Sequence, residues 1–148
     1  MFKHILLPTD GSKLSGKAVK QGLQLATSLG ARVTVFNVMP EGQIIIDEGY
    51  ATPTTLNLQE RLEKEGQKRS KKIVDAAKAE AAAAGVACEG ISVKSGSPYE
   101  AIIKQCKKSK CDLIMMASHG RTGLSSILLG SETAKVLTHS SVPVLVVR

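Results

Sequence analysis

The sequence predicts an α/β protein: a single open, doubly wound, five-stranded parallel sheet with helices on both of its faces. Two observations lead to this prediction. Five apolar, strand-like stretches are separated by helix-like stretches, an alternation that favours parallel strands joined by right-handed helical crossovers. The first strand-like stretch, Ile5-Leu6-Leu7, is continuously apolar, which is typical of strands buried on both faces. We therefore expect one domain over residues 1–148, long enough to bury a core.

The elements can be placed from apolar periodicity and from turn residues. The predicted strands span 4–8, 32–39, 86–94, 112–117 and 142–147, and the predicted helices span 13–29, 56–84, 98–110 and 132–138. The segment 41–55 has no firm period, and we expect it to be a mobile insertion.

Capping residues support the helix boundaries. Ser12 is placed to cap the first helix, and Gly30 and Gly85 are placed to end the first and second helices. The sequence Ser97-Pro98-Tyr99-Glu100 predicts a capping box, in which Ser97 caps the third helix and Glu100 reaches back. Residues at helical spacing mark one flank of the long second helix: Leu62, Gly66, Arg69, Ile73, Ala76, Ala77, Glu80 and Ala84.

The composition argues against a membrane or secreted protein. No apolar run approaches the roughly 20 residues that a membrane span requires, and the apolar run at 1–8 is too short for a signal peptide. The cysteines (Cys88, Cys106 and Cys111) are odd in number and lack C-x-x-C spacing, so we expect neither a disulfide framework nor a zinc site. These features predict a cytoplasmic protein.

The chain is basic, with 20 Lys and Arg residues against 13 Asp and Glu residues and a net charge of +7. Such a charge attracts nucleic acids, anionic lipids or phosphorylated small molecules. No basic stripe is interleaved with aromatic residues, which make up 3% of the chain, and no nucleic-acid-binding motif is present. We therefore expect no nucleic-acid partner.

A binding site is predicted where three strands end. In open parallel sheets, ligands bind beyond the carboxyl ends of the strands, at the point where the strand order reverses. The strands break at Pro8-Thr9-Asp10, at Val38-Met39-Pro40 and at 117–120. Asp10 is suited either to helix capping or to ligand binding, and we favour ligand binding because of its place at a strand end.

The stretch after the fourth strand has the composition of a phosphate-binding loop. The strand at 112–117 runs directly into small, polar and glycine residues that begin at Ser118, and a helical pattern resumes after Ser131. Gly120 and Gly130 allow close backbone approach, a helix N-terminus adds its positive dipole end, and Arg121 is the nearest cation. The stretch matches neither G-x-G-x-x-G nor the Walker pattern. His119 has no identifiable catalytic partner, and we expect it to be hydrogen-bonded to the backbone.

The chain resembles the nucleotide-binding universal stress proteins over its whole length. The resemblance rests on these stretches: Ile5-Leu6-Leu7-Pro8-Thr9-Asp10-Gly11-Ser12, Ser118-His119-Gly120-Arg121-Thr122-Gly123, Leu128-Leu129-Gly130-Ser131 and Val142-Pro143-Val144-Leu145-Val146-Val147. It implies a Rossmann-like sheet of strand order 3-2-1-4-5. Members that bind ATP show Gly, two residues, Gly, nine residues, then Gly and Ser or Thr. This chain follows the pattern except that Ala117 replaces the first glycine.

The resemblance also implies a role for each matching position. Pro8, Thr9 and Asp10 would line the adenosine end, Val38 would hold adenine, Met116 and Ala117 would border the ribose, and Gly120, Gly130, Ser131 and Glu132 would surround the phosphates. The implied ligand is ATP, with ADP or AMP as alternatives, and Mg²⁺ or Mn²⁺ would be held through the phosphates. Glu132 departs from expectation, because a carboxylate beside phosphates repels them.

The final strand predicts a partner. It is a continuously apolar edge strand, and such edges invite pairing with another chain. In the family this strand pairs antiparallel with its twin, which implies a homodimer through 142–147. The leading hypothesis is an ATP-binding homodimeric stress-response or signalling module with an unknown downstream protein. The alternatives are a nucleotide-free interaction protein and a slow ATP hydrolase. We expect at most weak hydrolysis, because the chain lacks a P-loop lysine and an evident base.

Overall fold

The computed structural model describes residues 1–42, 52–120 and 128–148. It confirms the predicted sheet, whose five parallel strands lie in the order β3-β2-β1-β4-β5. The strands are β1 (His4–Pro8), β2 (Arg32–Met39), β3 (Cys88–Lys94), β4 (Leu113–Ala117) and β5 (Val144–Val147). The helices are α1 (Lys13–Leu29), α2 (Pro53–Ala83), α3 (Pro98–Ser109) and α4 (Ser131–His139).

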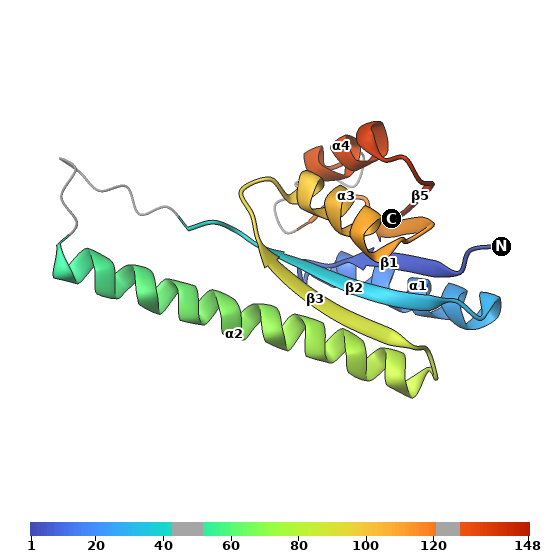
Figure 1. The fold of residues 1–148 in the computed structure, drawn as a ribbon, viewed down its shortest axis with the longest axis horizontal. Helices are drawn as coiled ribbons and strands as arrows, with labels where there is room; N and C mark the ends of the chain where they lie inside the picture. Colours follow the sequence, from blue (N-terminus) through green and yellow to red (C-terminus); the bar gives the residue numbers. More distant parts are fainter. Residues whose placement is uncertain (43–51, 121–127) are drawn as a thin grey trace.

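Helices cover both faces of the sheet, α1 and α2 on one side and α3 and α4 on the other (Figure 1). Alternate residues of each strand point to opposite faces, so the strands feed two cores. Ile5 and Leu7 belong to the core shared with α1 and α2, whereas Leu6 belongs to the core shared with α3 and α4. All three side chains are fully buried, as the continuous apolar run predicted.

The first helix begins and ends where the sequence predicts. The Ser12 side chain accepts a hydrogen bond from the Ser15 N–H at 3.2 Å, and Gly30 ends the helix with a φ of 63°, a conformation that favours glycine. The second helix begins at Pro53 with Thr52 as its cap, so it starts inside the segment predicted as an insertion. The remainder of that prediction falls on 43–51, outside the described residues.

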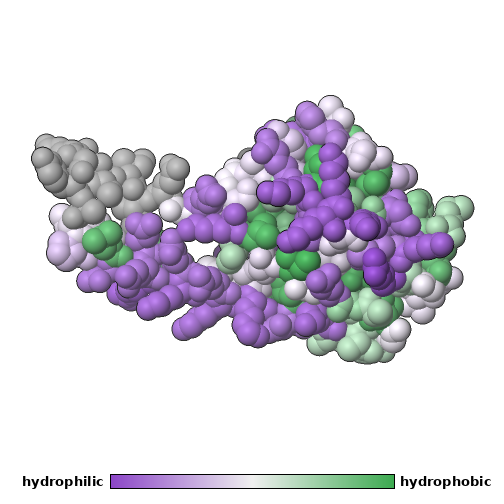
Figure 2. Space-filling model, viewed as in Figure 1, coloured by the Kyte–Doolittle hydropathy of each residue, from purple (hydrophilic) through white to green (hydrophobic). Residues whose placement is uncertain are grey.

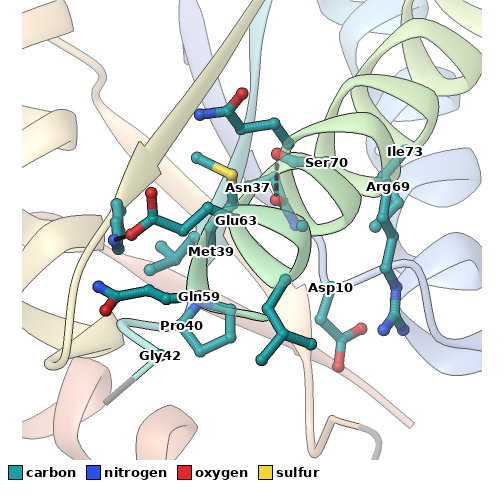
Figure 3. Close-up of a pocket in the computed structure, with 15 residues that line it drawn as sticks. Asp10, Asn37, Met39, Pro40, Gly42, Gln59, Glu63, Arg69, Ser70 and Ile73 are labelled. Atoms are coloured by element: carbon teal, nitrogen blue, oxygen red, sulfur yellow. Dashed lines mark hydrogen bonds and ion pairs between the residues drawn. The ribbon is translucent and has the colours of Figure 1, made fainter. Parts of the chain in front are cut away.

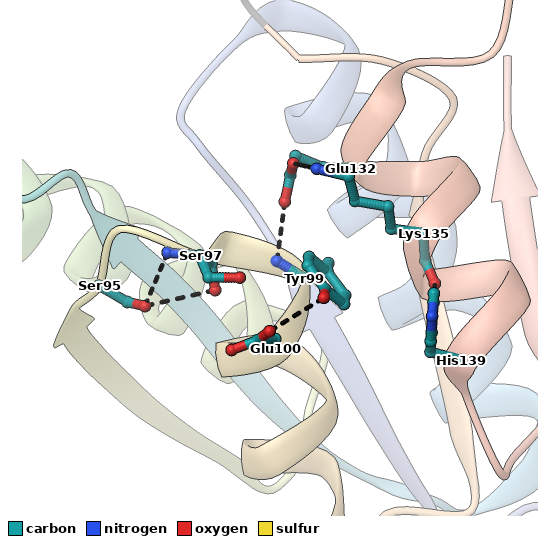
Figure 4. Close-up of polar contacts among 7 residues, drawn as sticks. All are labelled: Ser95, Ser97, Tyr99, Glu100, Glu132, Lys135 and His139. Carbon is teal, nitrogen blue, oxygen red and sulfur yellow. Dashed lines mark hydrogen bonds and ion pairs between the residues drawn. The ribbon is translucent and has the colours of Figure 1, made fainter.

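The predicted capping box of α3 is wrong. Ser97 makes no side-chain capping bond, and the Glu100 carboxylate accepts a hydrogen bond from the Tyr99 hydroxyl at 2.9 Å instead of reaching back (Figure 4). The cap comes from another helix: Oε2 of Glu132, in α4, accepts a hydrogen bond from the Tyr99 N–H at 2.8 Å. A carboxylate at this position also complements the positive end of the α3 dipole.

The long helix α2 has a different buried face from the flank marked by the sequence. Its buried residues are Ser70, Val74, Ala77 and Ala81. Val74 packs on Gly90 of β3, where any side chain would collide with it. The N-terminal part of α2 extends past the sheet, and its Leu56, Leu58 and Leu62 are about half exposed, at 49%, 49% and 50% (Figure 1). Hydrophilic residues dominate the outer side of this helix (Figure 2).

Among the described residues, no helix combines the length and the apolar character needed to cross a bilayer. The buried apolar side chains form two clusters, one on each face of the sheet.

Candidate functional site

A pocket of about 650 Å³ lies beyond the carboxyl ends of β1 and β2, and α2 forms its outer wall (Figure 3). This volume is within the range of small-molecule sites. The residues that line it are Asp10, Asn37, Val38, Met39, Pro40, Gly42, Gln59, Leu62, Glu63, Gly66, Gln67, Arg69, Ser70, Ile73 and Lys94. Two of the predicted site residues, Asp10 and Val38, are therefore brought together in one cavity.

The chain after β1 is held in a fixed turn. The Thr9 N–H donates to the Phe36 carbonyl at 2.8 Å, and the Asn37 amide donates to the Thr9 carbonyl at 2.7 Å. The Asp10 carboxylate accepts a hydrogen bond from the Ser12 N–H at 2.9 Å through Oδ1. Asp10 thus takes part in the start of α1 and also lines the pocket, and its role in ligand binding stays a prediction.

A chain of three hydrogen-bonded polar side chains, two of them buried, lies at the base of the pocket. The Ser70 hydroxyl, on α2, donates to Asn37 Oδ1 at 2.6 Å and lies 2.7 Å from the hydroxyl of Ser92 on β3. Ser70 is 2% exposed and Asn37 is 4% exposed, so the bond between them is made away from water, whereas Ser92 is exposed. Buried polar groups that satisfy one another in this way fix the elements that carry them. The network therefore ties α2, β2 and β3 to the turn at Thr9.

The other residues predicted for the adenosine end contribute differently. Val38 is half-buried at the end of β2 and paired in register with Val93; it is one of the residues that line the pocket, and it packs against the core shared with α3 and α4. Pro8 and Thr9 are buried and are not among the lining residues. Thr9 lies beneath the pocket, where its hydroxyl shares a hydrogen bond of 3.0 Å with Ser15. It supports the site through its backbone and its bond to α1.

The predicted ribose neighbours lie in β4 and are buried. Met116 is 7% exposed and packs in the core shared with α3 and α4. Ala117 is 6% exposed, and it belongs to the opposite core, with residues of α1. The Ala117 methyl group is thus engaged in core packing.

Beyond β4, backbone contacts bring α4 against the end of the strand. The Gly130 N–H donates to the Ser118 carbonyl at 2.7 Å, and the Thr133 hydroxyl donates to the Ala117 carbonyl at 3.0 Å. A Cβ at Gly130 would lie 3.0 Å from His119 Cα and 3.1 Å from the Ser118 carbonyl oxygen. Gly130 is therefore needed for the close approach of two backbone segments, and its N–H is already bonded within the protein. That Gly130 lies beside the phosphates stays a prediction.

The N-terminus of α4 remains the feature suited to an anion. The helix begins at Ser131 after Gly130, and no side chain of the described residues caps it. Uncapped N–H groups in the first turn and the positive end of the helix dipole favour anions. Ser131 is exposed there. The Glu132 carboxylate accepts hydrogen bonds from the Tyr99 N–H and from Lys135 Nζ at 3.1 Å, contacts that direct it toward α3 (Figure 4).

Asp10 and Gly120 connect the two sides of the site. A Cβ at Gly120 would lie 2.7 Å from Asp10 Oδ2, so the carboxylate sits against the backbone of the loop that follows β4. His119, beside it, shares a hydrogen bond of 3.2 Å between Nδ1 and the Ser118 hydroxyl, a side-chain partner where a backbone one was expected. Arg121 lies outside the described residues.

An ion pair closes the end of the pocket away from Asp10. Lys94 Nζ, at the end of β3, lies 2.7 Å from Glu63 Oε1 on α2. The hydrogen bond and the charge of Lys94 hold the pKa of the Glu63 carboxyl below its usual value. The charge of Lys94 is therefore paired with that of Glu63. Among the described residues, no group of three His, Cys, Asp or Glu side chains is placed to hold a metal ion.

Sequence reasoning missed the contribution of α2 and of Asn37. One signal was available: Asn37 places an amide inside a strand that is otherwise mostly apolar. The flank of Leu62, Gly66, Arg69 and Ile73 was recognised as a stripe, and it is this part of α2 that lines the pocket.

Comparisons with known proteins agree with this architecture. The profile of the Universal stress protein family matches residues 1–148. The universal stress protein MJ0531 of Methanocaldococcus jannaschii is 34% identical over 149 residues, which cover 100% of this chain and 83% of the relative. The solved structure of MJ0577, from the same organism, has a TM-score of 0.82 and 32% identity, with 99% of this chain and 96% of that chain covered.

Two of the similar solved structures were determined with an adenine nucleotide bound. A universal stress protein in complex with cAMP has a TM-score of 0.72 and 25% identity, with 99% of this chain and 97% of that chain covered. A family protein from Arabidopsis thaliana, solved with AMP bound, shares the fold at a TM-score of 0.68 and 15% identity, with 98% and 90% covered. The match over the whole length, together with the sheet order and the strand-end pocket, shows that this chain belongs to the universal stress protein family.

Proposed function

We propose that this protein is an adenine-nucleotide-binding module of the stress response, with ATP as its ligand and ADP or AMP as alternatives. The observation that carries the proposal is the pocket that Asp10 and Val38 line at the carboxyl ends of β1 and β2. Asp10 also lies against Gly120, in the loop between β4 and α4, and no side chain of the described residues caps the N-terminus of α4. The relatives solved with cAMP and with AMP support an adenine nucleotide as the ligand class.

The geometry gives each part of a nucleotide a suitable environment. Met39 and Ile73 offer apolar surface to a base, and the backbone of β2 at Val38 would offer hydrogen-bonding groups. The Asp10 carboxylate is suited to accept hydrogen bonds from ribose hydroxyls. The phosphates would then lie toward Gly120 and the first turn of α4, where Ser131 adds a hydroxyl.

A divalent ion would fit this arrangement as a companion of the phosphates. Mg²⁺ prefers phosphate and water oxygens with one or two carboxylates, so the phosphates would supply most of its ligands, and Asp10 is the carboxylate nearest the loop. When bound, the ion would neutralise phosphate charge. The chain's own residues would orient the nucleotide through the β1 turn and the α4 N-terminus.

The proposal includes a homodimer joined through β5. This strand is one edge of the sheet and pairs only with β4 within the described chain, and Leu145 is 40% exposed. Exposed apolar edges are pairing surfaces. The mass in solution, measured by light scattering for the wild-type protein and for Leu145→Glu, tests this point. A wild-type monomer would refute it.

Isothermal titration of the purified protein with ATP and Mg²⁺ tests nucleotide binding, after any nucleotide carried through purification has been identified and removed. Micromolar binding that AMP and ADP compete for is the expected result. The absence of heat, of carried nucleotide and of competition would refute the proposal and favour a nucleotide-free interaction module. A hydrolysis assay on the same sample would reveal the slow ATPase alternative.

A further inference from the structure

We propose that Arg69 of α2 contacts a phosphate group of the bound nucleotide, and so makes the site selective for phosphorylated adenosine over adenosine itself. This inference rests on the proposed function and assigns a role to a residue outside the glycine-rich stretch. It follows from the position of Arg69 on α2, from its relation to Asp10, and from the distribution of charge around the pocket.

The pocket-facing side of α2 brings Arg69 to the site. Gly66, Arg69 and Ile73 follow one another at helical spacing, and all three line the pocket. Gly66 contributes no side chain, so the space one turn before Arg69 stays open. The neighbouring residue, Ser70, is anchored to Asn37 and Ser92, which fixes the backbone that carries Arg69. The guanidinium is therefore delivered from a rigid element.

Arg69 lies at the end of the pocket that adjoins the loop after β4. Figure 3 shows its guanidinium and the Asp10 carboxylate extending in the same direction from the two walls of the cavity. Asp10 Oδ2 in turn lies against Gly120. A nucleotide whose ribose meets Asp10 would thus carry its first phosphate past Asp10, within the region that the long Arg69 side chain sweeps.

The charges around the pocket favour this assignment. Two cations of the described residues line the cavity, Lys94 and Arg69, and Figure 3 shows Glu63, the partner of Lys94, well apart from Arg69. Lys94 is paired with Glu63. Arg69 is exposed and stands where the anion would be. A guanidinium binds phosphate oxygens through paired, charge-assisted hydrogen bonds that a lysine does not reproduce.

The test compares Arg69→Ala with Lys68→Ala, which removes the same charge from the adjacent exposed position that does not line the pocket. Affinities for adenosine, AMP, cyclic AMP, ADP and ATP are measured by titration or by competition. For Arg69→Ala we expect a loss of about 10- to 100-fold for the phosphorylated ligands and little change for adenosine. Arg69→Lys should recover part of the loss, and Lys68→Ala should behave as wild type.

Each outcome decides the assignment. An equal loss for adenosine and for the phosphorylated ligands would overturn it, because Arg69 would then act on the base, the ribose or the pocket wall. Unchanged phosphate affinity in Arg69→Ala, or an equal loss in Lys68→Ala, would also overturn it while leaving the proposed function intact. A wild-type protein that binds none of the five ligands would refute both. The first ligand in the series to lose affinity identifies the phosphate that Arg69 contacts.

Discussion

The two sides of the candidate site are built by different means. On the side proposed for adenosine, polar side chains fix the backbone: the Asn37 amide donates a hydrogen bond to the Thr9 carbonyl, and the Ser70 hydroxyl donates one to Asn37. On the side proposed for the phosphates, two backbone segments pack directly together. The Gly130 N–H donates a hydrogen bond to the Ser118 carbonyl, and a side chain at position 130 would have no room. The first side depends on the side chains of Asn37 and Ser70, and the second depends on the absence of a side chain at Gly130. Substitutions should therefore damage the two sides in different ways.

The largest effect is expected at Gly130. In Gly130→Val, the new side chain would meet His119 and Ser118 backbone atoms that cannot move aside, and would push α4 away from the end of β4. We expect ATP binding to fall below detection in calorimetry, while light scattering still finds the dimer because β5 is not touched.

Gly16→Val is the matched control for Gly130→Val, since a Cβ at Gly16 meets no atom within 4 Å. This variant should bind ATP as the wild type does. Normal ATP binding by Gly130→Val would remove the α4 N-terminus from the site.

The adenosine side should fail through stability as well as binding. Asn37→Ala leaves the buried Thr9 carbonyl without its 2.7 Å donor and removes the partner of Ser70. We expect the free energy of unfolding to fall by about 1–3 kcal/mol, measured by urea denaturation, and ATP affinity to fall as well because the Asp10 turn loosens.

Ser92→Ala is the control for Asn37→Ala, because it removes one contact of Ser70 while the bond between Asn37 and Thr9 stays. Its effect on ATP affinity should be much smaller. Equal affinity losses in the two variants would mean that the bond to Thr9 has no special role.

Two substitutions of Glu132 separate the effect of its negative charge from the effect of its hydrogen bond to the start of α3. Glu132→Gln keeps an oxygen that can accept from the Tyr99 N–H, whereas Glu132→Ala removes it. We expect both variants to bind ATP a few-fold more tightly, since each removes a negative charge near the phosphates. Only Glu132→Ala should lose stability, by about 1 kcal/mol in urea denaturation. Weaker ATP binding in Glu132→Gln would indicate that the carboxylate assists the ligand.

The smallest effect on binding is expected at Ala117. Because its methyl group belongs to the core shared with α1, Ala117→Gly should lower the free energy of unfolding by about 1 kcal/mol and leave ATP affinity within twofold of wild type. A clear gain in affinity, measured by calorimetry, would show instead that the methyl group crowds the ligand.

The fold was predictable because its signals are local. Continuous apolar runs such as Ile5-Leu6-Leu7 identify buried strands, and Ser12 and Gly30 bound a helix by rules that act within one turn. The cap of α3 was mispredicted because the side chain that makes it, Glu132, lies 33 residues from Tyr99. A nearby carboxylate, Glu100, satisfied the sequence rule without making the bond.

The site was predictable only in outline, for a related reason. Strand ends such as Asp10 and Val38 meet by topology, which the order of elements encodes. Asn37, Ser70 and Arg69 join the site through the tertiary packing of α2, which no local spacing specifies. The close packing of Gly130 against the backbone at Ser118 and His119 could not be predicted from the sequence either, because a glycine is equally suited to phosphate approach and to close backbone packing.

The order of the strands sets how near each part of the site would lie to the interface of the proposed dimer. β4 alone separates β1 from β5, and the Ser118 N–H donates to the carbonyl of Val147, the last residue of β5, at 2.8 Å. In the proposed dimer, the phosphate side of each subunit would thus be one hydrogen bond from the shared edge, whereas α2 and β3 would lie at the two distal ends.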